Sequence, residues 1–183
     1  SADAVQRIVV VGDSTASSYP AARYPRTGWG QVVDDFVSAD VAILNRAVSG
    51  RSTRDYRSLG HFDAVMAELR EGDLLLIQFG HNDEKIEDPA RYSDAATAFP
   101  AGLREFVRGA RARGAVPVLL TPVARRVFDG QGRPVDTHGD YARAVRQVAA
   151  AEHVTLIDLA QRSMDWIEAL GPDASKAYYL YDP

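Results

Sequence analysis

A serine in a position suited to nucleophilic chemistry follows the first apolar run of the chain. Ser14 lies within VVVGDSTASSYP, residues 9–20, just past three valines and a glycine that are typical of the end of a buried strand. A side chain at such an end projects above the sheet, beside unpaired backbone N–H groups that can stabilise an oxyanion. Because Asp, Ser and Thr are also the preferred N-caps of helices, this segment alone leaves a simple capping role open.

Two further segments carry polar groups that would complement a serine nucleophile. NRAVSGRS, residues 45–52, contains Gly50, and QFGHND, residues 78–83, contains Asn82. Each follows a predicted strand, and the ends of neighbouring parallel strands meet at one edge of a sheet. We therefore expect the hydroxyl of Ser14, the N–H of Gly50 and the amide of Asn82 to face one small volume.

The elements that position these residues alternate along the chain. Short β-branched runs predict five strands, and amphipathic stretches between them predict helices. The strands are expected at residues 7–11, 41–45, 73–79, 116–121 and 154–158, each buried on both faces, and the helices at residues 29–37, 62–69, 103–110, 141–149 and 159–170. This alternation predicts an α/β fold: a three-layer α/β/α sandwich around a flavodoxin-like five-stranded parallel sheet.

Composition narrows the possible partners. The 183 residues suit a single domain, and 46% hydrophobic with 25% charged residues is typical of a globular protein. A net charge of −4 argues against a nucleic-acid partner, and no apolar run approaches the roughly 20 residues of a membrane span. The sequence has no cysteine, so cysteine usage gives no information about the redox compartment.

Two long connections leave predicted strand ends, at residues 80–92 and 122–139, where ligands bind in open α/β sheets. Arg125 and Arg126 lie in the second connection. They predict either a clamp for a uronate carboxylate or salt bridges to the acidic residues 82–88. Of the aromatic residues near this edge, Trp29 is expected to pack in the interior, and three tyrosines could stack on sugar rings: Tyr19, Tyr24 and Tyr92.

Five motifs in order resemble the SGNH (GDSL-like) hydrolases, and most closely their rhamnogalacturonan acetylesterase group. They are GDSTAS, GWG, NRAVSGRS, FGHND and TPVARRVF, and they span nearly the whole chain. The resemblance implies that Ser14 attacks an ester carbonyl. It also implies that the N–H groups of Ser14 and Gly50 and the amide of Asn82 bind the oxyanion, with no cofactor and no metal. His81 is then expected to contact substrate or a loop, and Asp13 and Asp83 to accept hydrogen bonds from loop backbone.

A serine nucleophile also needs a base, which this family supplies in an Asp-x-x-His block after the fifth strand. None of the four histidines, at positions 61, 81, 138 and 153, follows an Asp by three residues. The expected single domain of residues 1–183 would then lack that block and a last helix. The other possibilities are that another element or chain completes the site, or that His138, two residues after Asp136, acts as the base.

The expected function is a secreted serine esterase that removes acetyl groups from cell-wall carbohydrate of the rhamnogalacturonan, pectin or xylan type. The resemblance, rather than a leader sequence in SADAVQR, implies export. Alternatives are another SGNH lipase, acyl esterase or thioesterase, a flavodoxin-like nucleotide-binding module with phosphate where GDSTAS opens a helix, or a non-catalytic carbohydrate-binding protein. The oligomeric state is not indicated.

Overall fold

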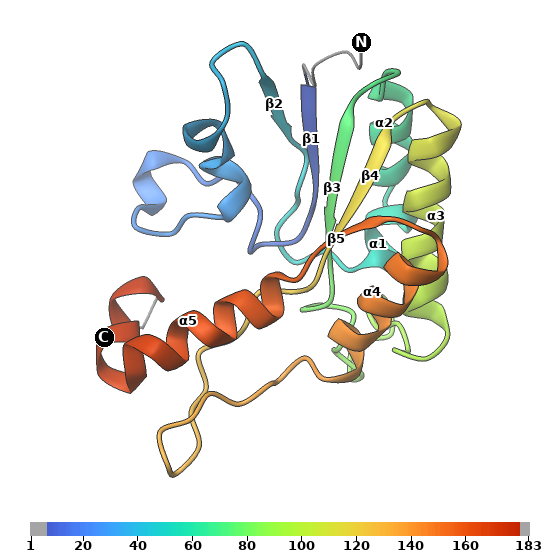
Figure 1. Cartoon of the computed structure of the whole chain (residues 1–183). Coiled ribbons are helices and arrows are strands. Elements are labelled where there is room, and N and C mark those ends of the chain that lie inside the picture. Colours follow the sequence, from blue (N-terminus) through green and yellow to red (C-terminus); the bar gives the residue numbers. More distant parts are fainter. Residues whose placement is uncertain (1–6, 180–183) are drawn as a thin grey trace.

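A five-stranded parallel sheet forms the centre of the molecule (Figure 1). The computed structural model describes residues 7–179. The strands are β1 (Arg7–Gly12), β2 (Ala42–Asn45), β3 (Leu74–Gln78), β4 (Val116–Leu120) and β5 (Thr155–Ile157). The α-helices are α1 (Thr53–Ser58), α2 (His61–Glu68), α3 (Ala98–Ala112), α4 (Asp140–Ala151) and α5 (Leu159–Ala174), and four 3-10 segments are η1 (Ala21–Arg23), η2 (Trp29–Gln31), η3 (Val33–Phe36) and η4 (Ser175–Tyr178).

The sheet has the order β2-β1-β3-β4-β5, which confirms the flavodoxin-like prediction. The ends of β1, β2 and β3 therefore lie side by side, as the site requires. Each predicted strand agrees with the structure to within a residue at either end. The expectation of burial on both faces is wrong for β2 and β5, because they are the edge strands and their side chains are half-buried or exposed.

One face of the sheet is covered by α1 to α4, which lie together on one side in Figure 1. The core there is rich in aromatic residues: Tyr56 from α1, Phe79 after β3 and Phe106 from α3 pack with ring centroids 5.2 to 5.8 Å apart. The helices α3 and α4 supply a continuous apolar stripe, so burial of that stripe holds this layer on the sheet.

The opposite face is covered by α5 and by the 3-10 segments rather than by a regular helix after β1. The predicted helix at residues 29–37 is wrong: this stretch forms η2 and η3. Two glycines explain the difference, because a Cβ at Gly28 would lie 2.0 Å from the Ser17 carbonyl oxygen and one at Gly30 would lie 2.4 Å from that of Ala16. The backbone lies against residues 15–17, where the N–H groups of Trp29 and Gly30 donate to the carbonyls of Thr15 and Ala16, and the stretch forms 3-10 turns rather than an α-helix.

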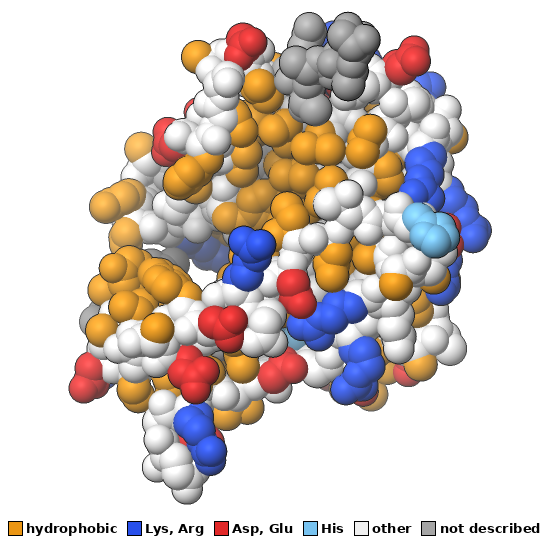
Figure 2. Space-filling model, in the orientation of Figure 1, with side chains coloured by type: hydrophobic (Ala, Val, Ile, Leu, Met, Phe, Trp, Pro, Cys, Tyr) orange, Lys and Arg blue, Asp and Glu red, His pale blue; other side chains and the backbone are white. Residues whose placement is uncertain are grey.

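This second face is only partly covered. Val10, Leu76 and Val118 form its buried centre, but Val116 is 52% exposed and Ile157 is 36% exposed. Figure 2 shows hydrophobic side chains gathered over this part of the sheet, above α5. Within residues 7–179, no helix is both long and apolar enough to cross a lipid bilayer.

The short helix α1 was missed by the sequence prediction, although its start has a clear signal. The Ser52 hydroxyl accepts a hydrogen bond from the Asp55 N–H, and the Asp55 carboxylate accepts one from the Ser52 N–H at 2.7 Å. This capping box fixes the first turn directly after Gly50. The position of the Gly50 loop therefore depends on α1.

Candidate active site

Ser14 lies in a tight turn directly after β1. Gly12 allows the strand to approach β3, since a Cβ there would lie 2.7 Å from the Gln78 carbonyl oxygen. The buried Asp13 carboxylate accepts hydrogen bonds from the Thr15 N–H at 2.9 Å and the Thr15 hydroxyl at 2.7 Å. No helix begins here, so the interpretation of Ser14 as an N-cap is wrong. The Ser14 side chain is half-buried and is not engaged in capping.

The Gly50 loop is attached to the end of β1 by a hydrogen bond of 3.0 Å from the Val48 N–H to the Gly12 carbonyl. Gly50 has a φ of 78°, a conformation that favours glycine. The Asn82 amide donates to the Arg51 carbonyl at 3.1 Å, which joins the Gly50 loop to the loop after β3. The other N–H of that amide has no partner among residues 7–179, so it remains available to a ligand.

Arg91 strengthens this junction and was missed by the sequence prediction. Its guanidinium group donates to the Asn82 side-chain oxygen at 3.2 Å and lies 3.4 Å from the Gly50 carbonyl oxygen. Because the Asn82 oxygen accepts from Arg91, the amide N–H₂ is oriented away from it. Nothing in the segment DPARY signals this role, since the contact crosses nine and 41 residues of sequence.

Asp83, in the loop after β3, also joins this loop to the segment that follows Gly50. Its buried carboxylate accepts hydrogen bonds from the Thr53 N–H at 3.1 Å and from the Thr53 hydroxyl at 2.5 Å. Burial raises the pKa of Asp83 to about 7, and the hydrogen bonds from Thr53 oppose that rise. The predicted structural roles of Asp13 and Asp83 are confirmed, because both carboxylates accept backbone N–H groups of the site loops.

His81 and His138 lie edge to face, with ring centroids 4.4 Å apart. His81 Nδ1 is 3.6 Å from Asp13 Oδ2, and both buried atoms lack a hydrogen-bond partner. His138 has partners on both ring nitrogens: Glu84 Oε1 at 2.5 Å and the Val123 carbonyl at 2.8 Å. These two partners do not favour the alternative in which His138 acts as the base, because its Nε2 faces the Val123 carbonyl rather than the Ser14 hydroxyl.

Arg125 and Arg126 both have partners within the protein. Arg125 forms a salt bridge with Glu84 at 2.8 Å, in the acidic loop, and lies 3.5 Å from the His81 carbonyl oxygen. Arg126 donates to the Ser175 hydroxyl at 2.8 Å and lies over the ring of Phe128. The salt-bridge prediction is confirmed for Arg125, and the carboxylate clamp remains a prediction for both residues.

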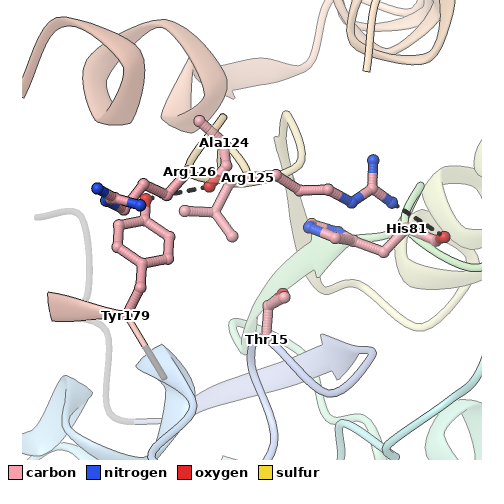
Figure 3. A pocket seen from close by; sticks show the side chains of 7 residues that line it. Thr15, His81, Ala124, Arg125, Arg126 and Tyr179 are labelled. Atoms are coloured by element: carbon pink, nitrogen blue, oxygen red, sulfur yellow. Dashed lines mark hydrogen bonds between the residues drawn. The ribbon is translucent and has the colours of Figure 1, made fainter. Parts of the chain in front are cut away.

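Two adjoining hollows lie at this edge of the sheet. The smaller, of about 390 Å³, is lined by Thr15, His81, Arg125, Arg126 and Tyr179 among others, as Figure 3 shows. The larger, of about 870 Å³, opens at Ser14 and Thr15 and runs between residues 19–32 and α5. Tyr19 and Trp29 line it, while Tyr24 is 82% exposed and Tyr92 is absent from both linings.

The two remaining histidines lie at the positions that the sequence predicts. His61 begins α2, and His153 precedes β5 at the opposite end of the sheet. Among residues 7–179, no histidine is hydrogen-bonded to the Ser14 hydroxyl. In the same residues, no three acidic or histidine side chains gather in a group that could hold a metal ion.

Comparisons with known proteins identify the family of the chain. The model of the GDSL-like lipase/acylhydrolase family matches residues 10–182. The chain is 38% identical over 175 residues to the rhamnogalacturonan acetylesterase RhgT of Bacillus subtilis, covering 96% of this chain and 74% of RhgT. It is 34% identical over 173 residues to the probable rhamnogalacturonan acetylesterase YesY of the same organism, covering 94% of this chain and 79% of YesY.

Solved structures show the same fold. The YxiM protein of Bacillus subtilis superposes with a TM-score of 0.86 at 27% identity, over 97% of this chain and half of that one. The acetylxylan esterase Axe2 of Geobacillus stearothermophilus superposes with a TM-score of 0.68 at 19% identity, over 92% of this chain and 83% of Axe2. The family match covers nearly every residue, including the Ser14, Gly50 and Asn82 segments. The chain belongs to the GDSL-like lipase/acylhydrolase family.

Proposed function

We propose that this protein is a carbohydrate O-acetylesterase with Ser14 as its nucleophile. The observation that carries the proposal is the junction of three loops at one sheet edge: the Ser14 turn, the Gly50 loop bonded to Gly12, and the Asn82 amide bonded to Arg51. The similarity to RhgT and YesY supports acetylated carbohydrate as the substrate class. Within that class, the proposed substrate is a polysaccharide of the rhamnogalacturonan, pectin or xylan type.

In the proposed reaction the Ser14 oxygen attacks the acetyl carbonyl while a base removes the hydroxyl proton. The N–H groups of Ser14 and Gly50 and the free N–H of Asn82 stabilise the oxyanion. The intermediate collapses to an acetyl-serine, and the proton passes to the departing sugar oxygen. Water then hydrolyses the acetyl-serine to acetate and restores the Ser14 hydroxyl.

The base is proposed to come from an Asp-x-x-His segment beyond the described residues, followed by a helix. Two observations support this. No histidine of residues 7–179 is bonded to Ser14, and the sheet face around Val116 and Ile157 is apolar and open, as a surface for a further helix would be.

The alternatives receive less support. A phosphate site where GDSTAS opens a helix is disfavoured because no helix begins there. A lipase or thioesterase differs from the proposed enzyme in its acyl group, and the similarity to RhgT favours acetyl esters. Because plant cell-wall polysaccharide lies outside the cell, the proposal includes secretion.

The test is Ser14→Ala in the intact protein, assayed for acetate release from acetylated rhamnogalacturonan and acetylated xylan. We expect the rate to fall by about 10³ or more, because the nucleophile is lost. A fluorophosphonate should label the wild type and leave the variant unlabelled. Ser58→Ala, which changes an exposed serine at the end of α1, is the matched control and should keep both properties. Acetate release that survives in Ser14→Ala contradicts the proposal.

A further inference from the structure

The groove that opens at Ser14 has features that the esterase chemistry does not require. One wall is a single face of α5, because the four residues of that helix lining it have the spacing i, i+3, i+4, i+7: Leu159, Arg162, Ser163 and Trp166. The other wall comes from residues 25–32, and Ala177 and Tyr178 of η4 also line the groove, together with Tyr179. With a volume of about 870 Å³, the groove is much larger than an acetyl group needs.

Aromatic rings are open to solvent along this groove. Trp166 is 45% exposed and Tyr178 is 61% exposed, and their ring centroids lie 4.5 Å apart in an edge-to-face pair. Exposed aromatic groups of this size, supported by each other, are typical of binding surfaces. Their flat apolar faces suit the C–H faces of sugar rings, while the indole N–H and phenol hydroxyl can bond to sugar hydroxyls.

The charge of the lining is opposite to that of the whole chain. The chain has 25 acidic and 21 basic residues, yet the groove is lined by Arg26 and Arg162 and by no aspartate or glutamate. Within residues 7–179, no carboxylate lies within 4 Å of either guanidinium group. Two guanidinium groups that line one groove without an acidic partner are suited to binding carboxylates.

Arg26 is also placed close to the nucleophile. Its guanidinium group lies 4.8 Å from the ring centroid of Tyr19. The hydroxyl of that tyrosine donates to the Ser14 carbonyl at 2.7 Å. Tyr19 therefore connects the arginine to the turn that carries Ser14, which places Arg26 on the Ser14 side of the groove.

We propose that Arg26 and Arg162 select acidic oligosaccharides, by pairing with uronate carboxylates while neighbouring sugar rings lie on Trp166 and Tyr178. This inference rests on the proposed function, since it takes Ser14 as the reacting end of the groove. It distinguishes uronate-containing substrates from neutral xylan. It also assigns recognition of the negatively charged substrate to Arg26 and Arg162. Arg125 and Arg126, by contrast, already have partners in the protein.

The kinetic test compares Arg26→Gln and Arg162→Gln in the intact enzyme. We expect the ratio of kcat/KM for an acetylated galacturonate oligomer to that for an acetylated xylo-oligomer to fall about tenfold in each variant, because a charged hydrogen bond is lost. Arg70→Gln removes an exposed arginine at the opposite end of the sheet and should keep the wild-type ratio. An unchanged ratio in both groove variants overturns the inference.

A binding test separates this inference from the esterase proposal. The chain has two tryptophans, Trp29 and Trp166, and both line the groove, so intrinsic fluorescence reports its occupancy. In the Ser14→Ala protein, unacetylated trigalacturonate should change the fluorescence, and xylotriose should bind at least tenfold more weakly. Adding Arg26→Gln or Arg162→Gln to Ser14→Ala should raise the Kd for trigalacturonate about tenfold. Equal affinity for the acidic and neutral trisaccharides overturns the inference, whatever the activity of Ser14→Ala.

Discussion

The two sides of the candidate active site differ in how far their polar groups are satisfied. On the side of Gly50 and Asn82, Arg91 bonds to both loops and Thr53 bonds to the buried Asp83. On the side of Ser14, the buried atoms Asp13 Oδ2 and His81 Nδ1 have no hydrogen-bond partner. Along the adjoining groove, Arg26 and Arg162 have no carboxylate partner among residues 7–179.

This difference matches the roles proposed for the two sides. Donors that stabilise an oxyanion work best when fixed beforehand, since they then cost no reorganisation during the reaction. Groups that bind a substrate carboxylate must instead be free to form new bonds. The contrast therefore predicts that substitutions on the Asn82 side change the rate of the chemical step, whereas substitutions along the groove change selectivity.

The largest effect is expected for Asn82→Ala. Loss of one fixed oxyanion donor costs about 10²–10³ in kcat. KM for a small acetyl ester should change little, because the donor acts mainly in the transition state. Steady-state kinetics on the intact protein measure both quantities. A rise in KM with an unchanged kcat would mean that Asn82 binds substrate rather than the oxyanion.

The next effect concerns stability rather than rate. The pKa of Asp83 is raised to about 7 in the folded protein, so between its ordinary value near 4 and 7 the folded state holds a proton that the unfolded state releases. The contribution of Asp83 to the free energy of unfolding should therefore fall as pH rises through this window, by up to about 1.4 kcal/mol per pH unit.

Urea unfolding of the wild type and of Asp83→Asn at several pH values measures this dependence. Asparagine cannot ionise, yet its side-chain oxygen can still accept from Thr53, so the difference between the two proteins should change with pH in the stated direction. A difference that stays constant from pH 4 to 7 would show that Asp83 is not the group responsible.

A smaller effect is expected for Arg91→Ala. Because Arg91 positions Asn82 and Gly50 without being an oxyanion donor, kcat should fall roughly tenfold, as expected when a catalytic group is slightly misplaced. Arg91→Lys should restore part of the rate, since an ammonium group can reach one of the two oxygens. If both variants lose stability while kcat is kept, Arg91 is structural and does not position the donors.

Much of the fold could be predicted because the apolar pattern of each strand lies within a few consecutive residues. Continuous apolar runs such as LLLIQF indicate strands wherever the chain places them, and the alternation with helices leaves few topologies. The predicted helix at 29–37 is wrong because Gly28 and Gly30 are pressed against residues 15–17, and this contact cannot be read from the segment itself. The solvent exposure of the side chains of β2 and β5 likewise depends on the order of the strands, which leaves these two at the edges of the sheet.

The order of the residues was enough to predict which strand ends carry Ser14, Gly50 and Asn82, since each lies three to five residues after a predicted strand whose direction fixes its end of the sheet. The contacts that support these groups, and the groove beside them, could be seen only in the folded protein. Arg91 reaches Gly50 across 41 residues, and the groove joins Arg26 to Arg162 from opposite walls. Such contacts depend on how distant segments pack against one another, and no local spacing of residue types encodes that packing.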